Sequence, residues 1–304
     1  MKIVSLLPSA TEIVYELGLG GQLVGVSSDC DYPPEVRDKQ VISDSALDAD
    51  EGSSPREVDA EVRSRVADSE PIYRLHRDLI RELRPDLILA QDLCRVCAVP
   101  SGHVTEALEK LGCESDVISL DPQSLGEVLE GIAQVADASS VSDRGDELIA
   151  DLRSRIEAVR SVTSGLEAIP TLALEWADPP FSGGHWIPEM VRVAGGRDVL
   201  GIERAPSRTC TWSEVAGAAP DVIVFMPCGY GLIEAMAQAH GLNEIPEYAA
   251  TPAAERGQVW AVDGSSYFSR PGPRLVEGLE ILAWILHPES FAEPPPGRVQ
   301  RVSP

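Results

Sequence analysis

The sequence predicts an α/β protein made of two lobes, each with a parallel β-sheet, joined by one long helix. Three observations predict this fold. In the first half of the chain, short apolar runs alternate with amphipathic segments, which is the pattern of strands and crossover helices in a parallel sheet. Between Ser142 and Val162 the alternation gives way to one charged amphipathic stretch, long enough for a helix of about 30 Å. The alternation then resumes in the second half of the chain.

The first lobe is predicted to cover residues 1–140. After the first strand, Ser9 and Glu12 form a capping box that predicts a helix start, and Gly18 predicts its end. The polar segment 43–69 is expected to contain a loop and an exposed helix. The expected strands lie at residues 2–7, 23–27, 86–90 and 116–120, and further helices are expected at 72–83, 103–113 and 124–138.

The linking helix is predicted over residues 141–165 and the second lobe over 166–291. A Pro-rich tail, 292–304, is expected to be frayed. In the second lobe, strands are expected at residues 171–176, 221–226 and 259–264, and helices within 185–196, 211–220, 232–242 and 274–288.

Composition limits the classes of partner. The formal net charge is −24, and an acidic surface argues against nucleic acid, whose phosphates need clustered Lys and Arg. Such a surface fits either adaptation to high salt or an ordinary acidic protein. The N-terminus lacks the apolar stretch of a secretory signal, and no apolar run suits a membrane span. These features predict a cytoplasmic protein with reduced cysteines and no membrane insertion.

Candidate binding residues follow the predicted strands. In parallel sheets, ligands bind beyond the carboxyl ends of the strands, where loops and helix N-termini meet. Aromatic rings there can cover a large flat ligand, and polar groups can orient it. The residues expected to bind a ligand are Asp31, Tyr32, Trp176, Phe181, His185, Trp186, Tyr230, Tyr267 and Arg270.

Four cysteines also follow predicted strands, and two of them form a Cys-x-x-Cys motif. Thiolates favour zinc and iron–sulfur clusters, so convergence of these thiols at one edge predicts a metal site. A redox pair and simple packing remain alternative explanations. Cys210, in a loop just before a predicted helix, can add a further thiol to this set. Cys113 is predicted to be an ordinary residue of a helix-to-strand turn. The predicted metal ligands are Cys30, Cys94, Cys97 and Cys228.

Several stretches resemble the class III solute-binding proteins. They include "LLPSATEIVYELGLGGQLVGVSSDCDYPPE", "LRPDLILA", "EWADPPFSGGHWIPEMVRVAGG", "PDVIVF" and "LVEGLEILAWILHPESF", and "DYPPE" and "GHWIPEM" point to the cobalamin-binding branch. The resemblance implies a corrinoid such as cobalamin, or a related metal complex, held between two lobes, with His185 as a candidate ligand of its metal. In that family, acidic residues dock onto a membrane transporter, for which Glu35 and Glu189 are candidates. Without a signal segment, however, a transporter partner is doubtful and a cytosolic member is expected.

The residues favour a binding protein over an enzyme. The chain contains no GxSxG elbow, phosphate-binding loop or dinucleotide fingerprint in the right context. The leading prediction is therefore non-enzymatic binding of a corrinoid-like ligand between the lobes. The alternative is a cytosolic zinc or iron–sulfur protein, redox-active or enzymatic, that uses the cysteines on the same scaffold.

Overall fold

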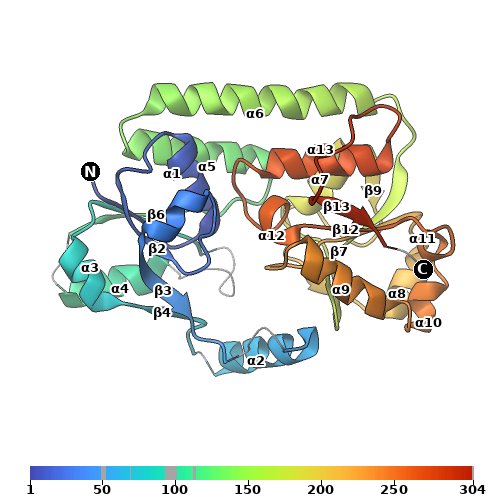
Figure 1. The fold of residues 1–304 in the computed structure, drawn as a ribbon, viewed down its shortest axis with the longest axis horizontal. Coiled ribbons are helices and arrows are strands. Elements are labelled where there is room, and N and C mark those ends of the chain that lie inside the picture. The colour runs from blue at the N-terminus through green and yellow to red at the C-terminus, as the bar shows by residue number, and fades with distance from the viewer. Residues whose placement is uncertain (49–52, 69, 93–100, 112–113, 303–304) are drawn as a thin grey trace. The chain divides into compact units, whose positions relative to one another are not determined.

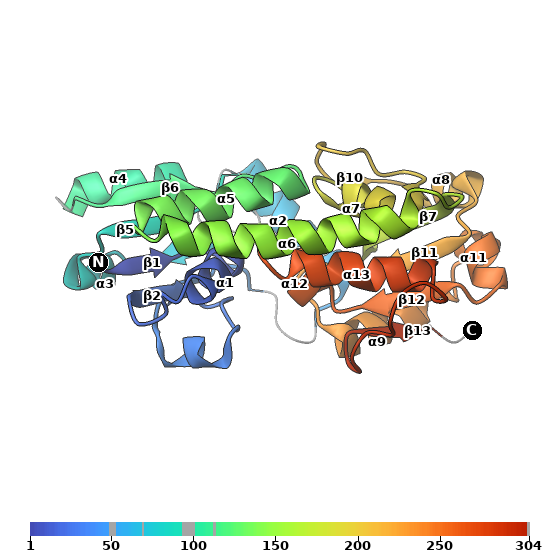
Figure 2. The ribbon, with the colours of Figure 1, turned by 90° about the horizontal axis from the view of Figure 1, so that it is seen from above.

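The computed structural model describes residues 1–304 except 49–52, 69, 93–100, 112–113 and 303–304. The chain divides into two compact units (Figures 1 and 2). Unit 1 comprises Met1–Pro122 and Gly126–Ala150, and unit 2 comprises Gln123–Leu125 and Asp151–Pro304. Among the described residues, no helix has both the length and the apolar character that crossing a membrane requires.

Unit 1 contains a six-stranded sheet in the order β4-β3-β2-β1-β5-β6. All its neighbouring strands are parallel except the pair β3–β4, so β1, β2, β5 and β6 end at the same edge. The apolar runs of β1 and β5 are buried because residues on both faces pack under helices. The strands are β1 (Ile3–Ser5), β2 (Leu23–Ser27), β3 (Gln40–Ser45), β4 (Tyr73–Leu75), β5 (Leu87–Ala90) and β6 (Asp116–Ser119), and the helices are α1 (Pro8–Glu16), the 3-10 helix η1 (Pro34–Asp38), α2 (Pro55–Ala67), α3 (Arg77–Leu83), α4 (Ser101–Leu111) and α5 (Leu125–Ala138).

Two local predictions for unit 1 are wrong. The segment 72–83 is not one helix, because Tyr73–Leu75 forms β4. This strand pairs with β3, and the sequence analysis predicted neither strand. The capping box of Ser9 and Glu12 is absent, since α1 begins at Pro8 and both side chains are buried in its first turns. Proline favours the first helical position, and this moves the helix start ahead of Ser9.

Unit 2 contains a mixed seven-stranded sheet in the order β10-β8-β7-β11-β12-β13, with β9 also paired to β7. Its centre, β7, β11 and β12, is parallel, and the antiparallel strands β8, β10 and β13 lie toward its edges. The strands are β7 (Ile169–Ala177), β8 (Pro180–Ser182), β9 (Gly196–Asp198), β10 (Arg208–Thr209), β11 (Val222–Phe225), β12 (Val259–Val262) and β13 (Val299–Arg301), and the helices are α7 (Ile187–Val193), α8 (Trp212–Ala218), α9 (Leu232–Leu242), α10 (Pro246–Ala249), α11 (Pro252–Glu255), α12 (Gly264–Tyr267) and α13 (Leu275–Leu286).

The C-terminal tail is not frayed as predicted. Its residues Val299–Arg301 form β13, which pairs antiparallel with β12, and Val302 is buried in the core cluster of unit 2. This core also contains Phe225 and Tyr248, both almost fully buried. Burial of Val302 and the hydrogen bonds to β12 stabilise residues 299–302.

The predicted long helix is present as α6 (Ser142–Thr163), a continuous helix of 22 residues. Within unit 2 it buries Leu152, Ile156 and Val159, which share one face at a spacing of four and three residues. It lies beside α13 (Figures 1 and 2), to which Arg155 makes a bidentate pair with Glu280 at N–O distances of 2.9 and 2.8 Å.

Candidate functional site

The central strands of unit 2 bring an aromatic pair to their carboxyl edge. Because β7 and β11 are parallel, with Leu174 opposite Phe225, the last residues of β7 lie beside the residues that follow β11. The backbone N–H of Cys228 donates to the carbonyl of Glu175 at 3.3 Å, which ties the two strand ends together. The rings of Trp176 and Tyr230 have centroids 5.5 Å apart at an interplanar angle of 46°.

A hairpin adds a third ring. Strand β8 turns back antiparallel to β7, and the register places Phe181 opposite Trp176. Trp176, Phe181 and Tyr230 are all partly exposed. Partial burial of the Tyr230 phenol raises its pKa. These three aromatic residues therefore offer apolar surface at one edge of the sheet. We call Trp176, Phe181, Tyr230 and the neighbouring His185 the aromatic face of unit 2.

A tight turn, Gly183–His185, follows β8, and we call it the His185 turn. Its backbone is bonded to the loop Arg204–Ser207: the His185 N–H donates to the Ala205 carbonyl at 2.6 Å, and the Arg204 N–H donates to the His185 carbonyl at 3.0 Å. A β-carbon on Gly184 would lie 2.1 Å from the Ser207 nitrogen, so only glycine fits there. His185 itself has φ +53°, a conformation that non-glycine residues rarely adopt.

The imidazole of His185 is held in one chemical form. Its Nδ1 lies 2.8 Å from Oε1 of Gln123. An amide oxygen only accepts, so this contact places a proton on Nδ1, and Nε2 keeps its lone pair while the ring is neutral. Burial lowers the pKa of His185, which favours the neutral ring at neutral pH. A neutral imidazole with an unprotonated Nε2 is the form that coordinates metals.

A partly buried acid, Glu175, is bonded to the His185 turn. Oε1 of Glu175 accepts the Gly184 N–H at 3.2 Å, and the Ser207 side chain hydrogen-bonds the same carboxyl group. Burial raises the pKa of Glu175 to about 8, with smaller contributions from the Cys228 thiol and Asp198, so the group is a neutral acid at neutral pH.

Sequence reasoning missed both Glu175 and Gln123. The signal for Glu175 was a lone acidic residue inside the apolar strand "TLALEW". Gln123 gave no signal, because its partner His185 lies 62 positions further along the chain.

Other residues predicted to bind a ligand have partners inside unit 2. Trp186 is only 5% exposed, and its Nε1–H donates to the Phe268 carbonyl at 2.9 Å. The Tyr267 ring has guanidinium groups near its centroid, Arg298 at 5.0 Å and Arg274 at 5.7 Å. These contacts are typical of structural roles. Arg270 is partly buried in the segment between α12 and α13.

In unit 1, the predicted residues after β2 separate into buried and exposed ones. Asp31 and Tyr32 are exposed in the loop that follows the strand. Cys30 is buried, and the Thr11 hydroxyl donates to its sulfur at 3.1 Å. These residues lie at the carboxyl edge of the unit 1 sheet, as the sequence predicted.

The predicted cysteine cluster finds no support. Cys94, Cys97 and Cys113 lie outside the described residues. Of the other predicted ligands, Cys30 is buried in unit 1 and Cys228 is exposed in unit 2. Within the part of the chain that the structure describes, no three His, Cys, Asp or Glu side chains are grouped so that they could hold a metal ion.

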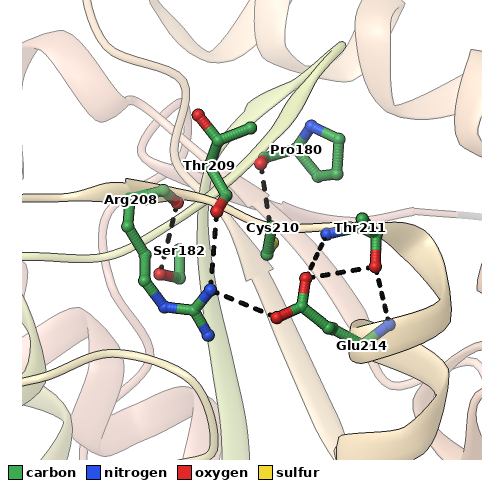
Figure 3. Close-up of polar contacts among 7 residues, drawn as sticks. All are labelled: Pro180, Ser182, Arg208, Thr209, Cys210, Thr211 and Glu214. Carbon is green, nitrogen blue, oxygen red and sulfur yellow. Dashed lines mark hydrogen bonds and ion pairs between the residues drawn. The ribbon is translucent and has the colours of Figure 1, made fainter.

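Cys210 is a structural residue between β10 and α8 (Figure 3). Its buried thiol lies 3.5 Å from the Pro180 carbonyl, and burial raises the pKa of the thiol. The next residue, Thr211, forms a capping box with Glu214, whose carboxylate also pairs with Arg208 at 3.3 Å. The thiol thus fills space at a helix start, where a protonated sulfur is a poor metal ligand.

The acidic candidates for transporter docking differ in their surroundings. Glu35 is exposed on η1. The Glu189 carboxylate instead accepts the backbone N–H of Leu125, which also belongs to unit 2, at 2.8 Å. A carboxylate at a helix start stabilises the unpaired N–H groups there, so Glu189 has a local structural role.

Comparison with known proteins identifies the family. The model of the periplasmic binding protein family matches residues 3–265. The chain belongs to this family. Over 96% of its length it is 26% identical to an uncharacterized ABC transporter substrate-binding lipoprotein, YvrC, of Bacillus subtilis strain 168, covering 82% of that protein. Over 92% of its length it is 26% identical to the vitamin B12-binding protein of Vibrio cholerae serotype O1, covering 86% of it. The apo structure of the periplasmic haem-binding protein RhuT from Roseiflexus sp. RS-1 is 25% identical, with a TM-score of 0.71 over 95% of this chain and 98% of that one.

These findings confirm the predicted fold class and a solute-binding protein rather than an enzyme. The expected cytoplasmic location is wrong. The similar proteins are described as a lipoprotein and as periplasmic, and both descriptions place them outside the cytoplasm. The sequence argument failed because it treated the lack of an apolar N-terminal segment as evidence of location. The alternative of a zinc or iron–sulfur protein receives no support from these relatives.

Proposed function

We propose that this protein is a receptor outside the cytoplasm that binds a corrinoid and passes it to an ABC transporter. The observation that carries this proposal is the aromatic face of unit 2, where three partly exposed rings gather at the strand ends and the His185 turn follows directly after β8. Flat macrocycles are bound by such apolar area with few polar contacts. The vitamin B12-binding relative and the transporter-associated lipoprotein supply the ligand class and the partner class.

Haem is the second candidate, and His185 favours it. A neutral imidazole with a free Nε2 is a common axial ligand of haem iron, and a haem-binding protein is among the similar structures. In this alternative the same aromatic residues contact the porphyrin, and His185 coordinates its iron.

Titration with cyanocobalamin and, separately, with hemin tests both candidates. Unit 2 holds every tryptophan of the chain, so quenching of their fluorescence reports binding there. Trp176→Leu and Tyr230→Leu are expected to weaken the preferred ligand about tenfold each, the effect of losing about 1.4 kcal/mol of contact. His185→Ala changes the visible spectrum of bound hemin if the imidazole ligates iron, whereas His240→Ala, an exposed histidine of α9, leaves it unchanged. If wild-type protein binds neither compound at micromolar concentration, the proposal is wrong.

A further inference from the structure

The Glu175 carboxyl group is the least expected feature of the aromatic face. It is an acid on a central strand, directly after the buried apolar residues Leu172, Ala173 and Leu174. Burial of a charge without a basic partner is costly, and the groups around this carboxyl are acidic or neutral: the Asp198 carboxyl, the Cys228 thiol, the Ser207 hydroxyl and the Gly184 N–H. A residue that only filled space at this position would be apolar.

The geometry gives the acid a specific use. A neutral carboxyl group has one oxygen that accepts and one O–H that donates. Oε1 accepts the Gly184 N–H at 3.2 Å, and the hydroxyl of Ser207 bonds the same group. Gly184 belongs to the His185 turn and Ser207 to the facing loop. Glu175 therefore bridges, from below, two segments that are also joined directly at His185–Ala205 and Arg204–His185.

The His185 turn needs such support. Its central residue has φ +53°, and non-glycine residues keep this conformation only where surrounding contacts impose it. The turn has no side chain at Gly183 or Gly184 to anchor it, so its anchors are hydrogen bonds. The remaining anchors are backbone bonds, which include the Gly183 N–H to the Ala173 carbonyl at 2.9 Å, and the contact of the imidazole with the Gln123 amide. Of these, only the bonds at His185 itself also join the turn to the loop Arg204–Ser207, so the Glu175 bridge reinforces that junction.

We infer that Glu175 is a positioning residue: its carboxyl group fixes the His185 turn against the loop Arg204–Ser207 and so sets the orientation of the His185 imidazole on the aromatic face. The link to ligand affinity rests on the proposed function, but the link to the turn does not. Glu175 touches no ligand in this scheme and acts through Gly184 and Ser207.

Three variants test the inference. Glu175→Gln keeps one acceptor and one donor at the same places, whereas Glu175→Leu keeps the volume and removes both. Ser207→Ala removes the other half of the bridge from an exposed loop and is a second variant should Glu175→Leu fail to fold. Glu244→Gln, at an exposed position, is the matched control.

The first measurement is amide hydrogen exchange by NMR on the ligand-free protein. We expect Glu175→Leu to speed exchange at Gly184 and His185 at least tenfold and to shift the His185 ring signals. Exchange at Met226, whose N–H joins β11 to β7 at 2.9 Å, should stay within twofold of wild type. Glu175→Gln should restore wild-type exchange, a rescue that a purely space-filling role for the side chain would not show.

The second measurement is the affinity for cyanocobalamin and hemin. Loss of affinity of about tenfold in Glu175→Leu, with recovery in Glu175→Gln, supports the inference. Wild-type exchange and ring signals in Glu175→Leu, or in Ser207→Ala where the former does not fold, overturn it. So does a Glu175→Gln protein that behaves like Glu175→Leu. If wild type binds neither compound, the proposed function fails while the exchange data still decide whether Glu175 positions the turn.

Discussion

The Glu175 carboxyl group makes unit 2 less stable as the pH rises. The pKa of Glu175 is raised from 4.5 to about 8 in the folded protein. Between these values, the folded state holds a proton that the unfolded state has lost, so stability falls as pH rises. Below about pH 4.5 both states are protonated, and above about pH 8 both are ionised, so the effect is confined to this window.

Between pH 6 and pH 7.5, the change of stability with pH comes from Glu175 and not from the neighbouring Asp198. Burial also raises the pKa of Asp198, but only to about 6, so its contribution to the slope ends near pH 6. At about 1.4 kcal/mol per pH unit, ionisable Glu175 lowers the free energy of unfolding of unit 2 by about 2 kcal/mol between pH 6 and pH 7.5. Replacing the acid with the neutral amide in Glu175→Gln should remove that cost. The gap in unfolding free energy between variant and wild type should therefore widen by about 2 kcal/mol.

Urea unfolding followed by tryptophan fluorescence measures this change in unit 2 alone. All five tryptophans lie in the part of the chain assigned to unit 2, at positions 176, 186, 212, 260 and 284. With a slope of about 2 kcal/mol per molar urea, the midpoints of wild type and Glu175→Gln should separate by about 1 M more at pH 7.5 than at pH 6. Glu244→Gln should run parallel to wild type. If the Glu175→Gln curve also stays parallel to wild type, Glu175 is ionised in the folded state and the reasoning is refuted.

Three further predictions concern packing and access. Gly184→Ala should destabilise unit 2 by about 2 kcal/mol or more, because the added carbon meets backbone 2.1 Å away, whereas Gly217→Ala, in open space on α8, should be neutral or slightly stabilising in the same urea assay. Arg155→Met should cost about 1 kcal/mol in the same assay by removing a bidentate but partly exposed ion pair between α6 and α13, and a cost near zero would contradict that role. Brief alkylation of native protein followed by peptide mass spectrometry should label the exposed Cys228 faster than the buried Cys210, and equal labelling would disprove the assigned burial.

The sequence predicted the buried strands well and the edge strands poorly. Apolar runs such as those of β5 and β11 are buried on both faces, so composition alone marks them. Strands β3, β4 and β13 are more polar and are stabilised by pairing with a neighbour that is distant in sequence. The periodicity of a short segment contains no information about a distant pairing strand. The sequence therefore predicted β4 as part of a helix and β13 as a frayed tail.

The candidate site shows the same division. Position at a strand end was enough to place Trp176 and Tyr230 at one edge of the sheet, because parallel topology brings strand ends together. The same rule also selected Trp186, whose indole N–H is bonded within unit 2 to a carbonyl 82 positions away. A sequence states that a residue is aromatic, but the partner of its polar atom decides whether the ring faces the core or the solvent.

The chain as a whole is strongly acidic, but two titratable groups at the aromatic face are uncharged at neutral pH. The formal net charge is −24, yet burial keeps the Glu175 acid and the His185 imidazole uncharged. An ionised Glu175 would place a negative charge directly under the turn that carries the imidazole and would draw a proton onto that ring. Protonation would remove the lone pair of Nε2, which is the atom able to coordinate a metal. Burial is the main cause of both the raised pKa of Glu175 and the lowered pKa of His185, so the same desolvated surroundings keep the imidazole in the neutral form that can coordinate a metal.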